Sequence, residues 1–147
     1  MVPYHHTQPG TTTLAICIAV AALLAAIAWR TGEMSMIPGL VVVGAAGLIF
    51  NSLTVEVSDE ELRWHFGPGL WSYRLAVDEI ETVSVVRNKW WNGFGIRMAP
   101  SFRLYNVSGL DAVELYLKSG DTRRIGTDDP QGLVGTARAL REILSVT

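Results

Sequence analysis

Few residues in this sequence are of the types that enzymes and metal sites use. Cys17 is the single cysteine and lies in an apolar run, which excludes a disulfide framework and a cysteine-based zinc site. His5 and His6 are adjacent near the N-terminus and lack the further ligands that one metal ion needs. His65 falls on the polar face of a predicted strand, and no nucleophile has an evident base. We therefore expect a non-enzymatic protein with no catalytic residue, no metal and no cofactor.

Asp128 and Asp129 are adjacent carboxylates that resemble a paired-carboxylate acid–base site. Pro130 follows them, and proline is favoured in the first turn of a helix. Apolar residues then recur at helical spacing, at Leu133, Val134, Ala137, Leu140 and Leu144. The pattern predicts an amphipathic helix at about residues 130–145, with one of the two aspartates as its N-cap.

Basic and aromatic residues gather between Glu81 and Asp111, where no acidic residue occurs. Tryptophan and tyrosine beside basic side chains are typical of surfaces that contact lipid headgroups. This stretch is therefore our candidate for binding a membrane or a partner. The candidate residues are Arg87, Lys89, Trp90, Trp91, Phe94, Arg97 and Arg103.

Some aromatic residues of this stretch have a simpler interpretation as core residues. We expect Phe102 and Tyr105, in a predicted strand, to fill the interior. Trp90 and Trp91 are adjacent, so in an extended segment one would point inward and the other outward. Gly93 and Gly95 predict a tight loop, because no phosphate-binding spacing surrounds them.

The chain divides into an apolar half and a charged half. Residues 1–10 are expected to be a tail, and Arg30 and Glu33 are the only charged residues from 11 to 53. A helix needs roughly 20 apolar residues to cross a bilayer. We expect two transmembrane helices, at about 11–29 and 36–53, packed through small residues as an antiparallel hairpin. Arg30 and the basic residues after Leu53 then place both termini in the cytoplasm, with the hairpin in the inner membrane.

Residues 14–28 also resemble the apolar segment of a signal peptide, with Ala26-Ile27-Ala28 as a cleavage site. Residues 1–10 contain no lysine or arginine, which a signal peptide normally has before its apolar segment. A retained membrane helix is the preferred interpretation, and cleavage of residues 1–28 is the alternative.

Alternation of apolar and polar residues begins at Leu53 and predicts strands. We expect about seven, at 53–57, 62–66, 71–75, 82–87, 102–106, 112–118 and 122–125. Together with the C-terminal helix they predict an α+β domain over residues 54–147, in which a bent antiparallel sheet or partly open barrel is capped by the helix.

Four segments carry a resemblance to a known family: Phe66-Gly67-Pro68-Gly69, Trp90-Trp91-Asn92-Gly93-Phe94-Gly95-Ile96-Arg97, Leu104-Tyr105-Asn106-Val107-Ser108-Gly109 and Arg124-Ile125-Gly126-Thr127-Asp128-Asp129-Pro130. In order and spacing they resemble uncharacterised bacterial membrane proteins with a two-helix hairpin before a pleckstrin-homology-like domain. The resemblance implies that fold and attachment to the membrane, and it implies no particular activity.

One departure from the eukaryotic pleckstrin-homology pattern excludes a ligand. The turn at residues 58–61 contains three acidic residues, which would repel the inositol phosphates that basic residues bind there. We expect no phosphoinositide, and the net charge of −2 gives no field that would attract nucleic acid.

Three functions fit these features. The first is a module at the cytoplasmic face that binds a membrane-protein partner or a second copy of itself. The second is sensing of anionic lipid by the basic, tryptophan-rich 87–103 loop. The third is an accessory subunit of a membrane enzyme or transporter.

Overall fold

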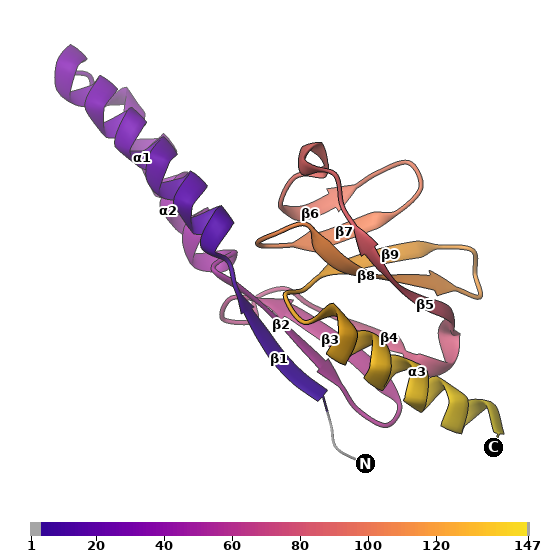
Figure 1. Ribbon diagram of the computed structural model, residues 1–147. Helices are drawn as coiled ribbons and strands as arrows, with labels where there is room; N and C mark the ends of the chain where they lie inside the picture. The colour runs from indigo at the N-terminus through magenta and orange to yellow at the C-terminus, as the bar shows by residue number, and fades with distance from the viewer. Residues whose placement is uncertain (1–3, 147) are drawn as a thin grey trace.

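The computed structural model describes residues 4–146, which form an α+β structure with nine strands in two sheets (Figure 1). The elements, in chain order, are β1 (Tyr4–Pro9), α1 (Thr11–Thr31), η1 (Met34–Met36), α2 (Ile37–Ile49), β2 (Ser52–Val57), β3 (Glu61–Phe66), β4 (Ser72–Ala76), η2 (Val77–Glu79), β5 (Ile80–Arg87), η3 (Trp90–Asn92), β6 (Gly95–Met98), β7 (Arg103–Asn106), β8 (Asp111–Leu117), β9 (Thr122–Gly126) and α3 (Pro130–Val146). The η elements are single 3₁₀ turns.

The first sheet is antiparallel with the order β1-β2-β3-β4. The second has the order β5-β8-β9-β7-β6, and β7 with β9 is its one parallel pair among the described strands. The sequence predicted about seven strands in one bent sheet. Two predictions therefore need correction: β1 and β6 are additional strands, and the strands divide into two sheets.

Both sheets and α3 share one hydrophobic core. The alternation predicted for β3 is observed, since Leu62, Trp64 and Phe66 are buried while the residues between them are partly exposed. Trp64 packs against Tyr105 of β7 with ring centroids 5.2 Å apart, so aromatic rings join the two sheets.

The predicted C-terminal helix is α3, which packs mainly on β5, η2 and β8. Asp129 caps it, because its Oδ1 accepts a hydrogen bond from the N–H of Gly132 at 3.1 Å. Four apolar residues of the predicted stripe are buried: Leu133, Val134, Ala137 and Leu140.

The N-terminal segment is not a tail over its described part, residues 4–9. It forms β1, which pairs antiparallel with β2 from Tyr4 opposite Val57 to Pro9 opposite Ser52. Burial raises the pKa of the Tyr4 phenol, and the nearby charge of Asp129 raises it further. The Tyr4 hydroxyl donates to Asp129 Oδ2 at 3.1 Å, which ties β1 to the start of α3.

The chain passes directly from β1 into α1, and directly from α2 into β2. Where the strands end, the N–H of Gly10 donates to the carbonyl oxygen of Asn51 at 2.6 Å. The helices then project side by side away from the two sheets (Figure 1). Each helix is thus joined to the domain without a linker.

Of the two expected membrane spans, α1 is long and apolar enough to cross a bilayer by length and composition. The second was predicted for residues 36–53, but α2 ends at Ile49 because Ser52 already belongs to β2. With η1 it forms a shorter apolar helical segment, Met34–Ile49.

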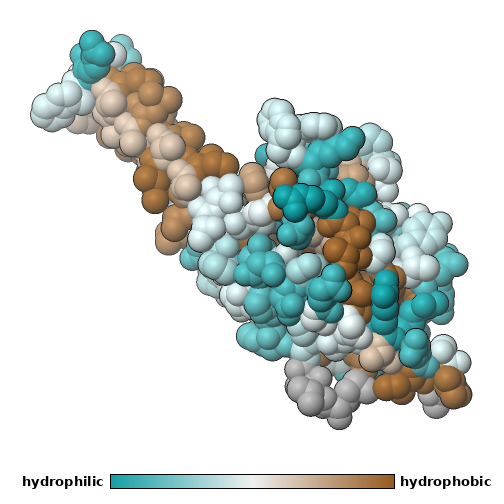
Figure 2. Space-filling view, viewed as in Figure 1, coloured by the Kyte–Doolittle hydropathy of each residue, from teal (hydrophilic) through white to brown (hydrophobic). Residues whose placement is uncertain are grey.

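Two glycines of α2, Gly39 and Gly47, face side chains of α1. A Cβ added to Gly47 would meet the Cys17 side chain at 3.6 Å, and one added to Gly39 would meet Leu24 at 3.4 Å. The rest of the helix surface is exposed and apolar. Figure 2 shows it as a mostly brown projection with a hydrophilic tip.

Candidate functional site

The predicted basic and aromatic residues lie in or beside one loop, residues 88–102, which we call the rim loop. It leaves β5, makes the 3₁₀ turn η3, forms the edge strand β6 and returns into β7. In Figure 1 it stands on the same side of the domain as the projecting helices. The structure therefore brings the candidate residues to one region.

Trp90 and Trp91 are both exposed, at 73% and 62%. The expectation that one would point into the core is wrong, because η3 is a 3₁₀ turn and the alternation of an extended strand does not apply. Their rings meet edge to face with centroids 5.8 Å apart. Two large apolar surfaces are thus presented together to the surroundings.

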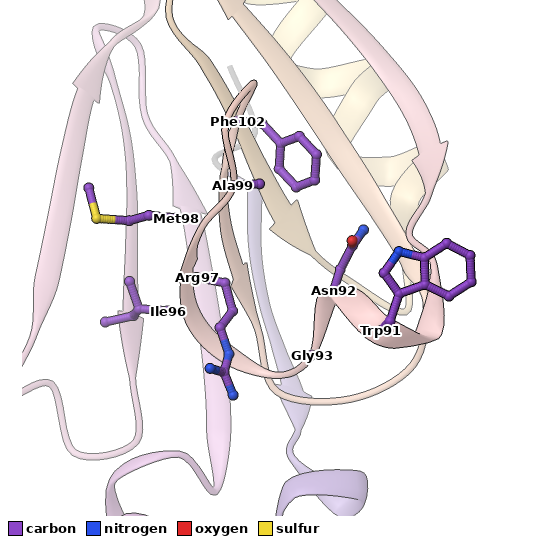
Figure 3. Close-up of a pocket in the computed structure, with 8 residues that line it drawn as sticks. All are labelled: Trp91, Asn92, Gly93, Ile96, Arg97, Met98, Ala99 and Phe102. Atoms are coloured by element: carbon purple, nitrogen blue, oxygen red, sulfur yellow. The ribbon is translucent and has the colours of Figure 1, made fainter.

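Exposed apolar residues of β6 extend this surface. Met98 is 76% exposed and Ile96 38%. Figure 3 shows their side chains directed to one side of the strand, with Trp91 and Phe102 on the other. Phe94, also predicted as a site residue, is partly buried in the turn before β6.

The four predicted basic residues have different surroundings. Arg87 forms an exposed ion pair with Asp111 at 3.2 Å, so one positive charge is neutralised locally. Lys89 Nζ lies 5.0 Å from the centre of the Trp91 ring, within the range of a cation–π contact. Arg97 and Arg103 are exposed and form no ion pair with any other described residue.

Arg97 is held in place by the backbone of its own loop. Its Nε donates to the carbonyl oxygen of Phe94 at 3.1 Å, which leaves both terminal nitrogens without a partner among residues 4–146. Gly93 has φ of +79°, and a Cβ there would approach Arg97 Nε to 3.1 Å. Glycine at 93 therefore serves both the turn and the position of the guanidinium.

Arg124 of β9 contacts both ends of the rim loop, at Asn88 and Phe102, a role that sequence patterns did not indicate. Its Nε donates to Glu114 at 2.6 Å and its Nη1 to the buried Asn88 at 3.3 Å. The guanidinium carbon also lies 3.8 Å from the centre of the Phe102 ring. Phe102 is consequently half-buried at the surface, which corrects its expected core position, whereas Tyr105 is buried as predicted.

A cleft of about 410 Å³ separates the rim loop from the helices. Its helix side is formed by Thr13, Ile16, Cys17 and Phe50, and its loop side by residues 93–97. A second cavity, of about 530 Å³, is lined by Trp91, Phe102 and Arg97 among others (Figure 3), and Arg97 also lines the cleft. Arg97 is thus the cationic side chain beside the base of α1.

Phe50 joins the helix base to the domain. Its ring meets Phe66 edge to face at 5.1 Å and stacks on Trp71 at 6.2 Å. Trp71 and its neighbour Leu70 are exposed, at 48% and 69%, in the turn between β3 and β4. Exposed apolar side chains therefore occur near the helix base in this turn as well as in the rim loop.

Most of the residues considered for catalysis take part in structural contacts. Asp129 caps α3, and Asp128 pairs with His6. His5 lies 3.4 Å from Glu56 on the neighbouring strand. His65 is half-buried rather than solvated. Residues 4–146 contain no group of three or more histidine, cysteine, aspartate or glutamate side chains that could hold a metal ion.

The edge of β5 beside α3 is partly occupied. Arg138 of α3 donates from Nε and Nη2 to the carbonyl oxygen of Val83, at 3.1 and 2.8 Å. An added strand would have to displace this guanidinium. Comparison of the sequence with known protein families and with curated proteins finds no match.

Proposed function

We propose that this protein is a non-enzymatic, membrane-anchored interaction module that contacts the bilayer surface through its rim loop. In this proposal α1 and α2 cross the inner membrane as a hairpin, and the domain lies on the cytoplasmic face. On the basis of the sequence resemblance, the domain is proposed to be pleckstrin-homology-like. The observation that carries it is the position of the rim loop, across a cleft from the first turns of α1.

The helices support attachment to a membrane. The 21 residues of α1 correspond to about 31 Å, close to the ~30 Å of a hydrocarbon core. None of its residues is buried within the described structure, although 16 of the 21 are apolar. A helix that is apolar all round belongs in a protein core or a membrane, and no core surrounds α1 in residues 4–146.

The ends of α1 carry residues that prefer the membrane–water interface. Trp29 is 90% exposed at the far end, beside Arg30, while Trp71, Trp90 and Trp91 are exposed on the domain side. Tryptophan is enriched at both interfaces of a bilayer. An interfacial position would account for four exposed tryptophans in one small protein.

The second interaction class, a membrane-protein partner or a second copy, has less support from the geometry. Strand addition at β5 would compete with Arg138. A bilayer, by contrast, matches the exposed tryptophans and Arg97, which lies beside an apolar helix and forms no ion pair within residues 4–146. We therefore propose the lipid surface as the primary contact.

The pairing of β1 with β2 supports a chain that keeps its N-terminus. Cleavage after Ala28 would remove β1 and leave the edge of β2 unpaired. We expect the intact mass of protein purified from membranes to include residues 1–28. A mature chain beginning at Trp29 would contradict the hairpin.

Spin labels can test the pose of the full-length protein in bilayers. The variant Cys17→Ala removes the native thiol, and Met98→Cys then places a label on the rim loop. We expect this label to be reached by lipid-soluble oxygen more than by a water-soluble nickel reagent. Ser119→Cys, in the turn between β8 and β9, is the matched control and should be fully aqueous. Equal aqueous exposure at both positions would refute contact of the rim loop with the membrane.

The sidedness is tested separately in intact cells. An impermeant maleimide should fail to label Ser119→Cys until the membrane is permeabilised. Immediate labelling would place the domain outside.

A further inference from the structure

We propose that the cleft between the rim loop and α1 binds the headgroup of one anionic phospholipid, with Arg97 as the residue that holds its phosphate. This inference rests on the proposed contact with the bilayer and adds a defined site and stoichiometry. It concerns a single bound lipid rather than a general attraction to charged surfaces.

The two sides of the cleft match the two parts of a phospholipid. Ile16, Cys17 and Phe50 form an apolar side that continues along α1, where acyl chains would lie. Residues 93–97 form the opposite side, which offers the guanidinium of Arg97 beside the apolar residues Phe94 and Ile96. The volume of about 410 Å³ suits a headgroup and the first carbons of a chain.

The guanidinium of Arg97 is preorganised to bind an anion in the absence of lipid. The hydrogen bond from Nε to Phe94 orients the guanidinium and leaves Nη1 and Nη2 unpaired among the described residues. Two parallel N–H donors on a planar group bind a phosphate through two oxygens, which a lysine cannot reproduce. No acidic residue occurs between Glu81 and Asp111 to compete for this arginine.

The other basic residues are less suited to this role. Arg87 is paired with Asp111, and Lys89 lies over the Trp91 ring. Arg103 is unpaired within residues 4–146 but does not line the cleft. Comparing the lipid affinities of Arg97 and Arg103 variants therefore distinguishes a defined binding site from a general effect of surface charge.

The test is native mass spectrometry of the full-length protein released from detergent, after incubation with phosphatidylglycerol or phosphatidylcholine. We expect one retained phosphatidylglycerol per chain and little retained phosphatidylcholine. Arg97→Gln should lower the affinity for phosphatidylglycerol roughly fivefold, the factor expected for one basic residue at an anionic surface. Arg97→Lys should keep only part of the affinity for phosphatidylglycerol, because the positive charge remains but the two parallel N–H donors of the guanidinium are lost. Arg103→Gln is the comparison and should lower the affinity less than Arg97→Gln does, because Arg103 does not line the cleft.

Several outcomes would overturn the site. They are equal retention of the two lipids, equal loss in Arg97→Gln and Arg103→Gln, and displacement of the bound lipid by millimolar glycerol phosphate, which would indicate a site for free phosphate. The spin-label measurement at Met98→Cys separates this inference from the proposed function. A rim loop at the headgroup layer without a retained lipid would reject the site alone, whereas an aqueous rim loop would reject both.

Discussion

The side-chain oxygen of Thr13 donates a hydrogen bond to the carbonyl oxygen of Val107 at 2.6 Å. This contact joins the first turn of α1 to the segment after β7. Ser108 extends the joint, since its Oγ lies 3.0 Å from Thr11 Oγ1 and 2.9 Å from Thr12 Oγ1. Three consecutive threonine side chains therefore attach α1 to the sheet that carries the rim loop.

Thr13→Val tests this joint. The substitution keeps the shape of the side chain and removes its donor, so we expect the free energy of unfolding to fall by about 0.5–1.5 kcal/mol. Denaturant titration in one detergent measures the change. Thr31→Val is the control, because the Thr31 hydroxyl donates to the carbonyl oxygen of Ile27 in its own helix and accepts only from the nearby N–H of Glu33 among the described residues, so it joins no sheet. Equal losses in the two variants would mean that the joint adds nothing beyond a local hydrogen bond.

Gly10 is the point where β1 becomes α1, and it has no room for a side chain. A Cβ at this position would lie 2.5 Å from the carbonyl oxygen of Phe50. We expect Gly10→Ala to destabilise the protein by about 1–3 kcal/mol, because backbone at the base of both helices must move. The thermal midpoint in detergent measures the effect.

Gly44→Ala is the matched control for Gly10→Ala. Apart from the adjoining backbone of α2 and its two chain neighbours, no atom of the described residues lies within 4 Å of a Cβ at position 44, so alanine should be tolerated and stabilise α2 by up to about 1 kcal/mol. Loss of stability in Gly44→Ala comparable to that in Gly10→Ala would show that the helix base is not specially constrained.

The sequence predicted those strands and helices in which the spacing of apolar residues reflects one buried face. β3 alternates because one of its faces, with Leu62, Trp64 and Phe66, fills the core. β1 could not be found in this way, because its residues are mostly polar and its partner strand begins after two helices. β6 is an exposed edge strand, which leaves no apolar alternation to detect.

The candidate site was predicted by composition and not by conformation. Basic and aromatic residues in a stretch without acidic residues indicated a candidate loop, and the structure brings them together in the rim loop. The orientation of Arg97 depends on a carbonyl three residues away and on the positive φ of Gly93, which emerge only when the loop folds. The support from Arg124 depends on pairing of β9 with β7 and β8, and such pairings are not encoded locally.

Tyr4 makes the free energy of unfolding depend on pH in the alkaline range. Its pKa is raised in the folded protein by burial and by Asp129, so the unfolded chain loses the phenol proton first. The contribution of Tyr4 is complete below about pH 10, the usual tyrosine pKa, and declines as the pH rises further. We expect the free energy of unfolding to fall more steeply above pH 10 in the unsubstituted protein than in Tyr4→Phe. Tyr73→Phe provides a comparison, because burial also raises the pKa of Tyr73. Identical pH profiles for Tyr4→Phe and the unsubstituted protein would exclude this linkage.

Trp64 and Trp91 should respond oppositely to the same substitution. Trp64 is fully buried and stacks on Tyr73 at 5.7 Å, so Trp64→Ala should cost about 3–5 kcal/mol or prevent folding. Trp91 is 62% exposed, and loss of its contact with Lys89 in Trp91→Ala should cost no more than about 1 kcal/mol. Trp91→Ala should instead make the label at Met98→Cys more accessible to the aqueous nickel reagent, because an interfacial ring has been removed. A large loss of stability in Trp91→Ala with unchanged label accessibility would mean that this ring packs within the domain, and its proposed role at the bilayer would then be withdrawn.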